Sequence, residues 1–278
     1  MQLLRTIKNH QRSLIYLGSM SQYKIEAGTG QYLGFMMAVL ADGMGGRTGG
    51  AMAAEQVIRT ARQLFDEFSP LTDDVAQMLH TIALEAHTII KLSGLTAEKE
   101  PHSTLVALVL TPSGTAHWAH AGDSRLYRYC GSTCAERTTD HSFVERLIEQ
   151  GRLKPDDVAN HRLSNILVNV LGSLQTEPFV TMGQYDGLKT GDAFLLCSDG
   201  LWQYVNQDEM GAMIAQSTPR QCSEQLIEKA RERAVGSNAD NCTLAVVKLV
   251  AHQAKVLAET LTASIRPSGL FVKRDHTR

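Results

Sequence analysis

The stretch VLADGMGGRTGG, residues 39–50, carries an apolar segment into one aspartate, Asp42, and then into five glycines within eight residues. Residues 33–41 predict a strand that leads into this loop. From Ala51 to Phe68 apolar side chains recur at helical spacing, so we expect the loop to open a helix. Densely placed glycines let a backbone approach a ligand closely. That ligand is either a nucleotide phosphate or a metal ion held by Asp42.

The spacing of the glycines argues against the nucleotide. Gly43, Gly45 and Gly49 follow G-x-G-x-x-x-G, which is one residue longer than the dinucleotide fingerprint. The acidic pair Asp66 and Glu67 lies about 20 residues further on, but in the predicted helix and not after a second strand. An aspartate at the head of the loop would also repel a pyrophosphate. Dinucleotide binding is therefore the weaker alternative, and a metal ion is preferred.

The composition predicts one large domain with a substantial core. The chain has 278 residues, of which 43% are hydrophobic. We expect the domain to cover residues 1–250. The sequence turns polar after Val250, and residues 251–278 are expected to form a loosely held tail.

Charge and cysteine content restrict the partners. Lysine and arginine number 27 against 29 aspartates and glutamates, so no nucleic-acid surface is predicted. The apolar runs are too short to span a membrane, and the N-terminus lacks the apolar segment of a signal peptide. Five scattered cysteines favour reduced thiols. We therefore expect a cytoplasmic protein that acts as a monomer, without nucleic acid or membrane.

Strands and helices are predicted in separate blocks. Residues 103–110, 115–121 and 125–130 read as three strands joined by short turns, as in an antiparallel meander. Residues 152–175 lack a regular pattern and read as an insertion. Further helices and strands follow from the same periodicities: helices at 73–92 (with Thr72 as N-cap), 141–151, 206–216 and 219–234, and strands at 192–199 and 241–250. This order indicates an α+β fold whose sheets are covered by helices.

Four aspartates stand at the ends of predicted strands. Asp42 follows one strand, Asp123 lies in the turn between two, Asp199 follows a buried strand and Asp240 precedes another. Hard divalent cations such as Mg²⁺ and Mn²⁺ prefer carboxylate, carbonyl and water oxygens. A single Asp-Gly pair is explained by a turn. The repetition of one device at four strand ends predicts a metal site.

Five motifs in order give the sequence a family resemblance. Together they resemble the motif series of the metal-dependent serine/threonine protein phosphatases, the PPM or type-2C family, over roughly residues 15–250. Met44 occupies a position where many eukaryotic members carry histidine, so the bacterial form is the closer likeness. The motifs are ADGMGG at 41–46, STLVALVL at 103–110, AHAGDSRLY at 119–127, CSDGLW at 197–202 and ADNCTLAVV at 239–247.

The resemblance implies a fold, a reaction and a set of ligands. It implies a central antiparallel β-sandwich flanked by helix pairs, with 152–175 as a flap-like insertion. It also implies the hydrolysis of phosphoserine and phosphothreonine on proteins, the products of a serine/threonine kinase, by a water that Mn²⁺ or Mg²⁺ activates. Two ions are implied, with a possible third. In this likeness Asp42 bridges the two ions, the Gly43 carbonyl binds one of them, Asp199 and Asp240 bind the other, and Asp123 joins Asp199 at the third.

One stretch departs from the family pattern. The family carries an Arg-x-x-Asn-Glu-Asp-like segment near its N-terminus, which supplies a phosphate-binding arginine and an acid near the metals. The corresponding region here is 18–28, and either Ser21-Gln22-Tyr23 or Glu26-Ala27-Gly28 takes the place of the acidic triplet. Neither alignment supplies the arginine or the aspartate. A phosphatase-like regulatory or binding protein with weak or no turnover is therefore the alternative function.

Three further residues are assigned structural roles. Trp118 and Trp202 stand in apolar settings, and both are expected in the core. Asp140 precedes the predicted helix 141–151 and is expected to be its N-cap.

Overall fold

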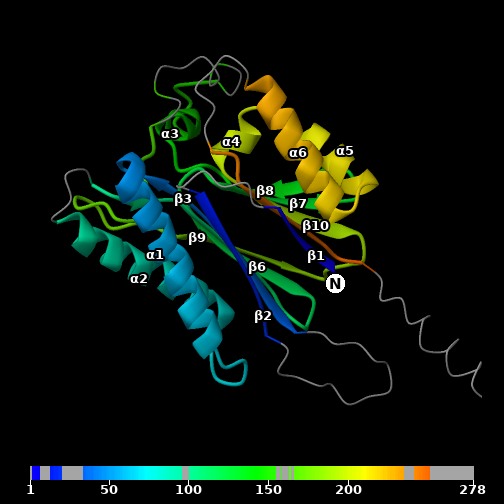
Figure 1. The fold of residues 1–278 in the computed structure, drawn as a ribbon, viewed down its shortest axis with the longest axis horizontal. Coiled ribbons are helices and arrows are strands. Elements are labelled where there is room, and N and C mark those ends of the chain that lie inside the picture. The colour runs from blue at the N-terminus through cyan, green and yellow to red at the C-terminus, as the bar shows by residue number, and fades with distance from the viewer. Residues whose placement is uncertain are drawn as a thin grey trace, which may run out of the picture.

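The computed structural model describes most of the chain in four layers (Figure 1). Helices cover the outer face of each of two stacked antiparallel sheets. Asp240, residues 21–28 of the altered stretch and the predicted tail 251–278 lie outside the described residues. The described residues are 2–6, 13–20, 34–95, 100–154, 157, 163, 166–234 and 241–250.

The first sheet has the strand order β2-β3-β5-β6-β9, and β4 pairs with β3 beside this path. The second sheet has the order β1-β11-β10-β7-β8. All of these pairs are antiparallel, as the sequence predicts. The bounds are β1 (Gln2–Thr6), β2 (Ser13–Met20), β3 (Phe35–Met44), β4 (His102–Ser103), β5 (Leu105–Leu110), β6 (Thr115–Ala121), β7 (Arg125–Cys130), β8 (Thr133–Arg137), β9 (Thr181–Asp186), β10 (Asp192–Cys197) and β11 (Leu244–Lys248).

The predicted three-stranded meander is wrong at its third strand. β5 and β6 pair as expected, but β7 pairs with β10 and β8 in the other sheet. The chain crosses between the sheets at Gly122, whose φ of 107° is in the left-handed region that glycine favours. A Cβ at this position would lie 2.7 Å from the Thr104 side chain, so the turn also needs a residue without one. Asp123 therefore lies where the chain passes from one sheet to the other.

Both faces of the central strands are apolar, because each sheet is covered on one side by helices and on the other by the second sheet. In β3, Met36, Ala38 and Leu40 belong to the core between the sheets, and the alternate residues Met37 and Val39 face the helices. Each fully buried side chain of this size contributes about 1.5–3 kcal/mol to stability. The apolar runs that the sequence shows are thus explained by burial on two sides.

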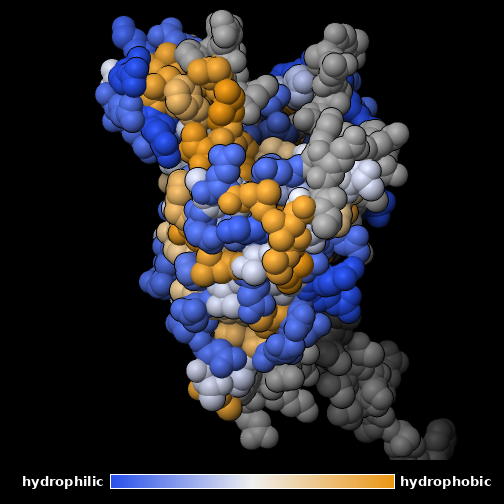
Figure 2. All heavy atoms as spheres, turned by 90° about the vertical axis from the view of Figure 1, so that its left-hand side faces the viewer, coloured by the Kyte–Doolittle hydropathy of each residue, from blue (hydrophilic) through white to orange (hydrophobic). Residues whose placement is uncertain are grey.

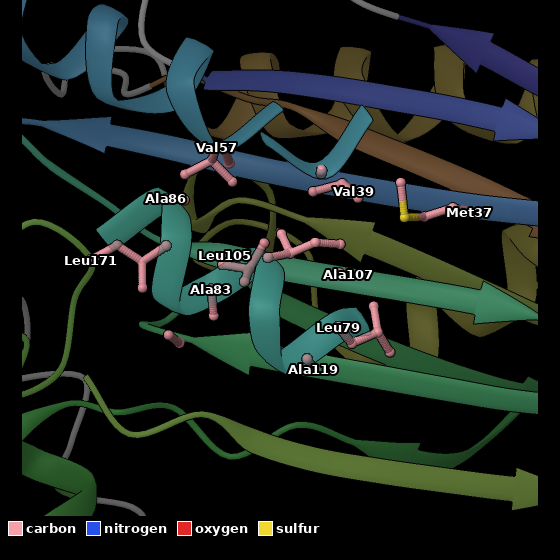
Figure 3. Packing of buried hydrophobic residues seen from close by; sticks show 14 of the residues in the cluster. Met37, Val39, Val57, Leu79, Ala83, Ala86, Leu105, Ala107, Ala119 and Leu171 are labelled. Atoms are coloured by element: carbon pink, nitrogen blue, oxygen red, sulfur yellow. The ribbon is translucent and has the colours of Figure 1, made fainter. Parts of the chain in front are cut away.

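Two long helices cover the first sheet. α1 (Gly46–Glu67) and α2 (Val75–Gly94) pack their apolar faces on β3, β5 and β6, as Figure 3 shows for Val57 and Leu79. On the second sheet lie α4 (Asp199–Trp202), α5 (Gln207–Gln216) and α6 (Pro219–Arg233). The short α3 (Phe143–Glu149) lies near α4 at the end of the sandwich where α1 begins (Figure 1).

Local capping differs from the sequence predictions in two places. The N-cap of α2 is Asp74 and not Thr72, because the Asp74 carboxylate accepts a hydrogen bond of 2.8 Å from the Gln77 amide. The N-cap of α3 is Ser142 and not Asp140, whose carboxylate forms an ion pair with an arginine instead.

The bounds of the glycine-rich loop also differ from the prediction, because β3 extends to Met44 and α1 begins at Gly46. The glycine-rich loop is therefore shorter than predicted.

The outer face of α2 combines polar and apolar side chains (Figure 2). Its exposed apolar residues are Leu84, Ile89 and Leu92, and Leu95 follows at the helix end.

Within the part of the chain that the structure describes, no helix is long and apolar enough to cross a membrane. The contacts of the described residues of 152–175 with the rest of the fold include isolated bridges at Leu167 and Leu171 and side-chain contacts of Asn169 with His141.

Candidate metal centre

Asp42 lies at the mouth of the space between the two sheets. It is the next member of the alternating row that places Met36, Ala38 and Leu40 between the sheets. Two hydrogen bonds to Thr104 fix its backbone: the Asp42 amide donates to the Thr104 hydroxyl (3.1 Å), and the Thr104 amide donates to the Asp42 carbonyl (2.8 Å). The Asp42 carboxylate is therefore carried by a rigidly held backbone two residues before the end of β3, and not after the strand as the sequence predicted.

Thr104 also connects Asp42 with the turn that contains Asp123. Its hydroxyl lies 2.8 Å from the hydroxyl of Ser124, and both side chains are almost fully buried. Because Ser124 directly follows Asp123, this hydrogen bond ties the Asp42 strand to the Asp123 turn. Burial makes such a bond expensive to break, since either hydroxyl would be left without a partner.

Asp199 is the first residue of α4, and this helix is tied to the same turn. The Asp199 carboxylate accepts a hydrogen bond from the Gln203 side chain (3.1 Å). At the other end of α4, the indole N–H of Trp202 donates to the carbonyl of Asp123 (3.0 Å). Trp118 is buried, as predicted. Trp202 is only half-buried, so the prediction that it lies in the core is confirmed only in part.

The residue that follows Asp240 is held against the neighbours of Asp199. The Ser198 hydroxyl donates to the Asn241 carbonyl (2.9 Å), and the Thr243 amide donates to the Ser198 hydroxyl (3.1 Å). A Cβ at Gly200 would lie 2.6 Å from the Asn241 carbonyl oxygen, so the two segments are in close contact. The side chain of Asp240 itself lies outside the described residues.

The electrostatics of the site favour a cation. Burial, together with the negative charges of Asp199 and Asp140, raises the pKa of the Asp123 carboxyl to about 7. Carboxylates that repel one another in this way are stabilised by a bound cation, and oxygen donors suit a hard ion. Among the described residues, no three histidine, cysteine, aspartate or glutamate side chains form a cluster that could hold a metal ion. Asp240, the fourth predicted ligand, is not among those residues.

Sequence reasoning missed two residues that support the Asp123 turn. Arg125 forms a bidentate ion pair with Asp140, with contacts of 2.8 and 2.7 Å. His141 accepts a hydrogen bond at Nδ1 from the Gly122 amide (3.2 Å), and the Asn169 side-chain nitrogen lies 2.7 Å from the same atom. Burial and the neighbouring His120 lower the pKa of His141 to about 3, so the ring stays neutral. The pairing partners lie far apart in the sequence, and no local pattern signals them.

A pocket opens beside this ion pair. It has a volume of about 270 Å³ and is lined by Asp140 and His141, by Arg146 of α3 and by Phe179 and Thr181. The pocket adjoins the Asp123 turn because Asp140 contacts Arg125, two residues after Asp123. None of Asp42, Asp123 and Asp199 is among its lining residues.

The raised pKa of Asp123 predicts a pH-dependent effect of Asp123→Asn on stability. The unfolded carboxyl has a pKa of about 3.9, so between about pH 4 and pH 7 the unfolded chain releases this proton while the folded protein keeps it. Stability from this group is therefore lost as the pH rises. In EDTA at about pH 7.5, Asp123→Asn should melt above the parent by on the order of 5 °C. The gain should shrink towards pH 4.

Differential scanning calorimetry of parent and variant across this pH range measures the difference. Contributions from other groups, such as His141, are common to both proteins and cancel. A gain that is independent of pH, or a loss at neutral pH, would show that the pKa of the Asp123 carboxyl is not raised in the folded state.

Comparisons with known proteins agree with this geometry. The serine/threonine protein phosphatase PstP of Mycobacterium tuberculosis is 28% identical over 219 residues, which are 79% of this chain and 41% of PstP. The chain thus spans less than half of that relative's length. The serine/threonine phosphatase stp of Listeria welshimeri is 34% identical over 183 residues, 63% of this chain and 69% of the relative.

A solved structure and a family model extend the comparison. The crystal structure of the catalytic domain of PstP in complex with two manganese ions has a TM-score of 0.64 and 25% identity, and the match covers 86% of this chain and 99% of that domain. The predicted α+β fold is thereby confirmed. The family model described as protein phosphatase 2C matches residues 12–232. Because this match covers most of the chain, the protein belongs to the protein phosphatase 2C family.

Proposed function

We propose that this protein hydrolyses phosphoserine and phosphothreonine on proteins, with a water activated by divalent cations. The observation that carries the proposal is the chain of hydrogen bonds that draws the aspartate segments together: Asp42 to Thr104, Thr104 to Ser124, and Trp202 to Asp123. Family membership supports the reaction, and the two manganese ions in the PstP structure support the cofactor. The two relatives with matching sequences are serine/threonine phosphatases, which also supports the reaction.

The proposed ligands are the four aspartates and one carbonyl. Asp42 and the carbonyl of Gly43, with Asp199 and Asp240, would hold two Mn²⁺ or Mg²⁺ ions, and Asp123 with Asp199 would hold a third. When bound, such ions supply a nucleophilic water at neutral pH and neutralise the charge of the phosphoryl group. The residues of the chain keep the carboxylates in place through the hydrogen bonds described above.

The remaining steps place few demands on side chains. Phosphoryl transfer depends mainly on positioning and on charge stabilisation, with the attacking and leaving oxygens in line. Met44 carries no proton donor, so we expect solvent water to protonate the leaving serine or threonine oxygen. No cysteine or serine nucleophile is required.

Phosphorylated proteins, the products of a serine/threonine kinase, are the proposed substrates, and a cytoplasmic monomer is the proposed form. The 152–175 insertion is proposed to contact them. The alternative is a regulatory or binding protein with weak or no turnover, and the missing arginine and aspartate in 18–28 favour it. The lysine and the tyrosine that this stretch contains cannot bind phosphate bidentately as an arginine does. Manganese-dependent turnover of a phosphothreonine peptide separates the two functions.

Substitution of the proposed ligands should remove metal-dependent activity. Asp42→Ala, Asp199→Ala and Asp240→Ala should each reduce hydrolysis of p-nitrophenyl phosphate with Mn²⁺ to the rate measured in EDTA, because a ligand of the main ion pair is lost. Asp186→Ala is the matched control. Asp186 also ends a strand and precedes a glycine, but it lies at the end of β9, where it bonds Thr115 at the start of β6.

Activity of the control should equal that of the parent. Circular dichroism of all four variants should show the parental fold. Parental turnover in Asp42→Ala or Asp199→Ala would exclude the proposed centre. A parent that folds and binds Mn²⁺ but hydrolyses neither ester nor phosphopeptide would favour the regulatory alternative.

Asp123 should behave differently from the other ligands. If it serves only a third, weakly held ion, Asp123→Ala should lower turnover but leave two tighter Mn²⁺ sites. Isothermal titration calorimetry counts the sites directly. Loss of all Mn²⁺ binding would mean that Asp123 belongs to the main pair of ions, and the assignment of the third site would then be wrong.

A further inference from the structure

The guanidinium of Arg125 is fixed on three sides at the edge of the metal centre. Its Nε and Nη2 donate to the two carboxylate oxygens of Asp140, at 2.8 and 2.7 Å. Its Nη1 donates to the Tyr127 hydroxyl (3.1 Å), and its Cζ lies 3.6 Å from the ring centroid of Trp202. The side chains of Arg125 and Asp140 are only 14% and 9% exposed, so water competes little with these contacts.

Trp202 converts this arrangement into a link between two candidate ligands. One face of its ring carries the Arg125 guanidinium, and its indole N–H donates to the Asp123 carbonyl at 3.0 Å. Trp202 is also the last residue of α4, whose first residue is Asp199. The ring is therefore attached at one end to the Asp123 turn and at the other, through one short helix, to Asp199.

Asp140 links the same turn to a third segment. The amide of the next residue, His141, donates to the Gly122 carbonyl (2.9 Å), and the His141 ring accepts from the Gly122 amide (3.2 Å). The turn 122–125 is thus bonded to the segment 140–141 through both its backbone and its arginine. Rotation of the turn away from α4 would have to break the bidentate ion pair and the stacking on Trp202 together.

We propose that Arg125 is a positioning residue of the metal centre, which acts through Asp140 and Trp202 to hold Asp123 at a fixed distance from Asp199. Arg125 is not itself proposed to touch an ion or a substrate. The inference rests on the proposed function for its consequence, which is that the ion shared by Asp123 and Asp199 is bound. This role requires arginine, because only its planar guanidinium can pair bidentately with a carboxylate and at the same time stack on an aromatic ring.

Arg128, three residues further along β7, supplies a matched control. Its Cζ lies 3.7 Å from the ring centroid of Tyr185, its Nε lies 3.4 Å from a Glu136 oxygen, and it is buried. The two arginines therefore share stacking, an ion pair and burial. They differ in that, within the described part of the chain, the hydrogen-bond, ion-pair and stacking partners of Arg128 are Glu136, Cys130 and Tyr185, and none of these is a candidate ligand. Arg125→Lys and Arg128→Lys lose the same kind of interaction at different places.

The experiment compares these two variants with the parent, using the full chain and Mn²⁺. Loss of an outer contact of a metal ligand typically weakens metal binding or activity 10–100-fold. Arg125→Lys should therefore weaken the weakest Mn²⁺ site in calorimetric titration by about tenfold or more. It should also lower kcat for p-nitrophenyl phosphate with little change in KM. Arg128→Lys should leave both quantities as in the parent, while both variants lose thermal stability.

A second readout needs neither metal nor turnover. The chain has two tryptophans, so the indole N–H signals of Trp202 and Trp118 are resolved by NMR after ¹⁵N labelling. Arg125→Lys should speed hydrogen exchange at the Trp202 indole, because its bond to the Asp123 carbonyl opens more often. Arg128→Lys should leave the Trp202 signal unchanged.

A third variant returns to the calorimetric titration with Mn²⁺. Trp202→Phe, which keeps a ring but loses the N–H, should weaken the same Mn²⁺ site as Arg125→Lys.

Two results would overturn the inference. One is parental Mn²⁺ affinity together with parental exchange at Trp202 in Arg125→Lys. The other is identical behaviour of the two lysine variants, which would reduce Arg125 to a general contributor to stability. Failure of the proposed function is recognised separately. A parent without turnover leaves the Mn²⁺ and exchange comparisons intact, and these alone decide the role of Arg125.

Discussion

The burial of a carboxyl among other carboxylates is the constraint on which the rest of this structure depends. Burial, together with the charges of Asp199 and Asp140, raises the pKa of the Asp123 carboxyl to about 7. Groups of like charge stay together where the surrounding structure holds them and a proton or a cation offsets the repulsion. Buried hydroxyls, a left-handed glycine and an ion pair hold the Asp123 turn in place at this end of the sandwich.

The sandwich resists the repulsion through its three apolar cores. One fills the space between the sheets, and the other two lie beneath the helices on either side. The same alternation that buries Leu40 between the sheets carries Asp42 to their mouth, so one register sets both stability and ligand position. Next to Asp42, the hydroxyls of Thr104 and Ser124 form a hydrogen bond that links the Asp42 strand to the Asp123 turn. Stability and site geometry are therefore properties of the same strands.

The sequence predicted the parts of this design that are local. Strand periodicity, helical spacing and the strand-end aspartates can be read in short windows, and six strands and the five helices of seven or more residues were predicted close to their observed bounds. The strands β1, β2, β4, β8 and β9 and the four-residue helix α4 were not predicted. The placement of β7 in the second sheet was not found, because periodicity indicates that a strand exists but not which strand it pairs with. The same limit explains Asp140. The position of Asp140 before a helix predicted an N-cap. The crossover at Gly122 instead brings Arg125 close, and the Asp140 carboxylate forms an ion pair with it.

The metal ligands form an intermediate case. Their segments were identified from sequence, and hydrogen bonds bring those segments together: Asp42 to Thr104, Thr104 to Ser124, Trp202 to the Asp123 carbonyl and Ser198 to the Asn241 carbonyl. The ligation itself stays a prediction, as does the part of Asp240, because coordination depends on side chains at the mouth and on the ions. The effect of the altered 18–28 region also stays a prediction, since most of that stretch lies outside the described residues.

Anomalous diffraction at the manganese edge, from crystals of the full chain grown with Mn²⁺, tests the central claim most directly. The account predicts two strong peaks at the mouth between the sheets, both in contact with the Asp42 carboxylate and one of them also with Asp199 and Asp240. A weaker peak is predicted between Asp123 and Asp199. Manganese bound elsewhere, with no peak at coordination distance from Asp42 and Asp199, would contradict the account.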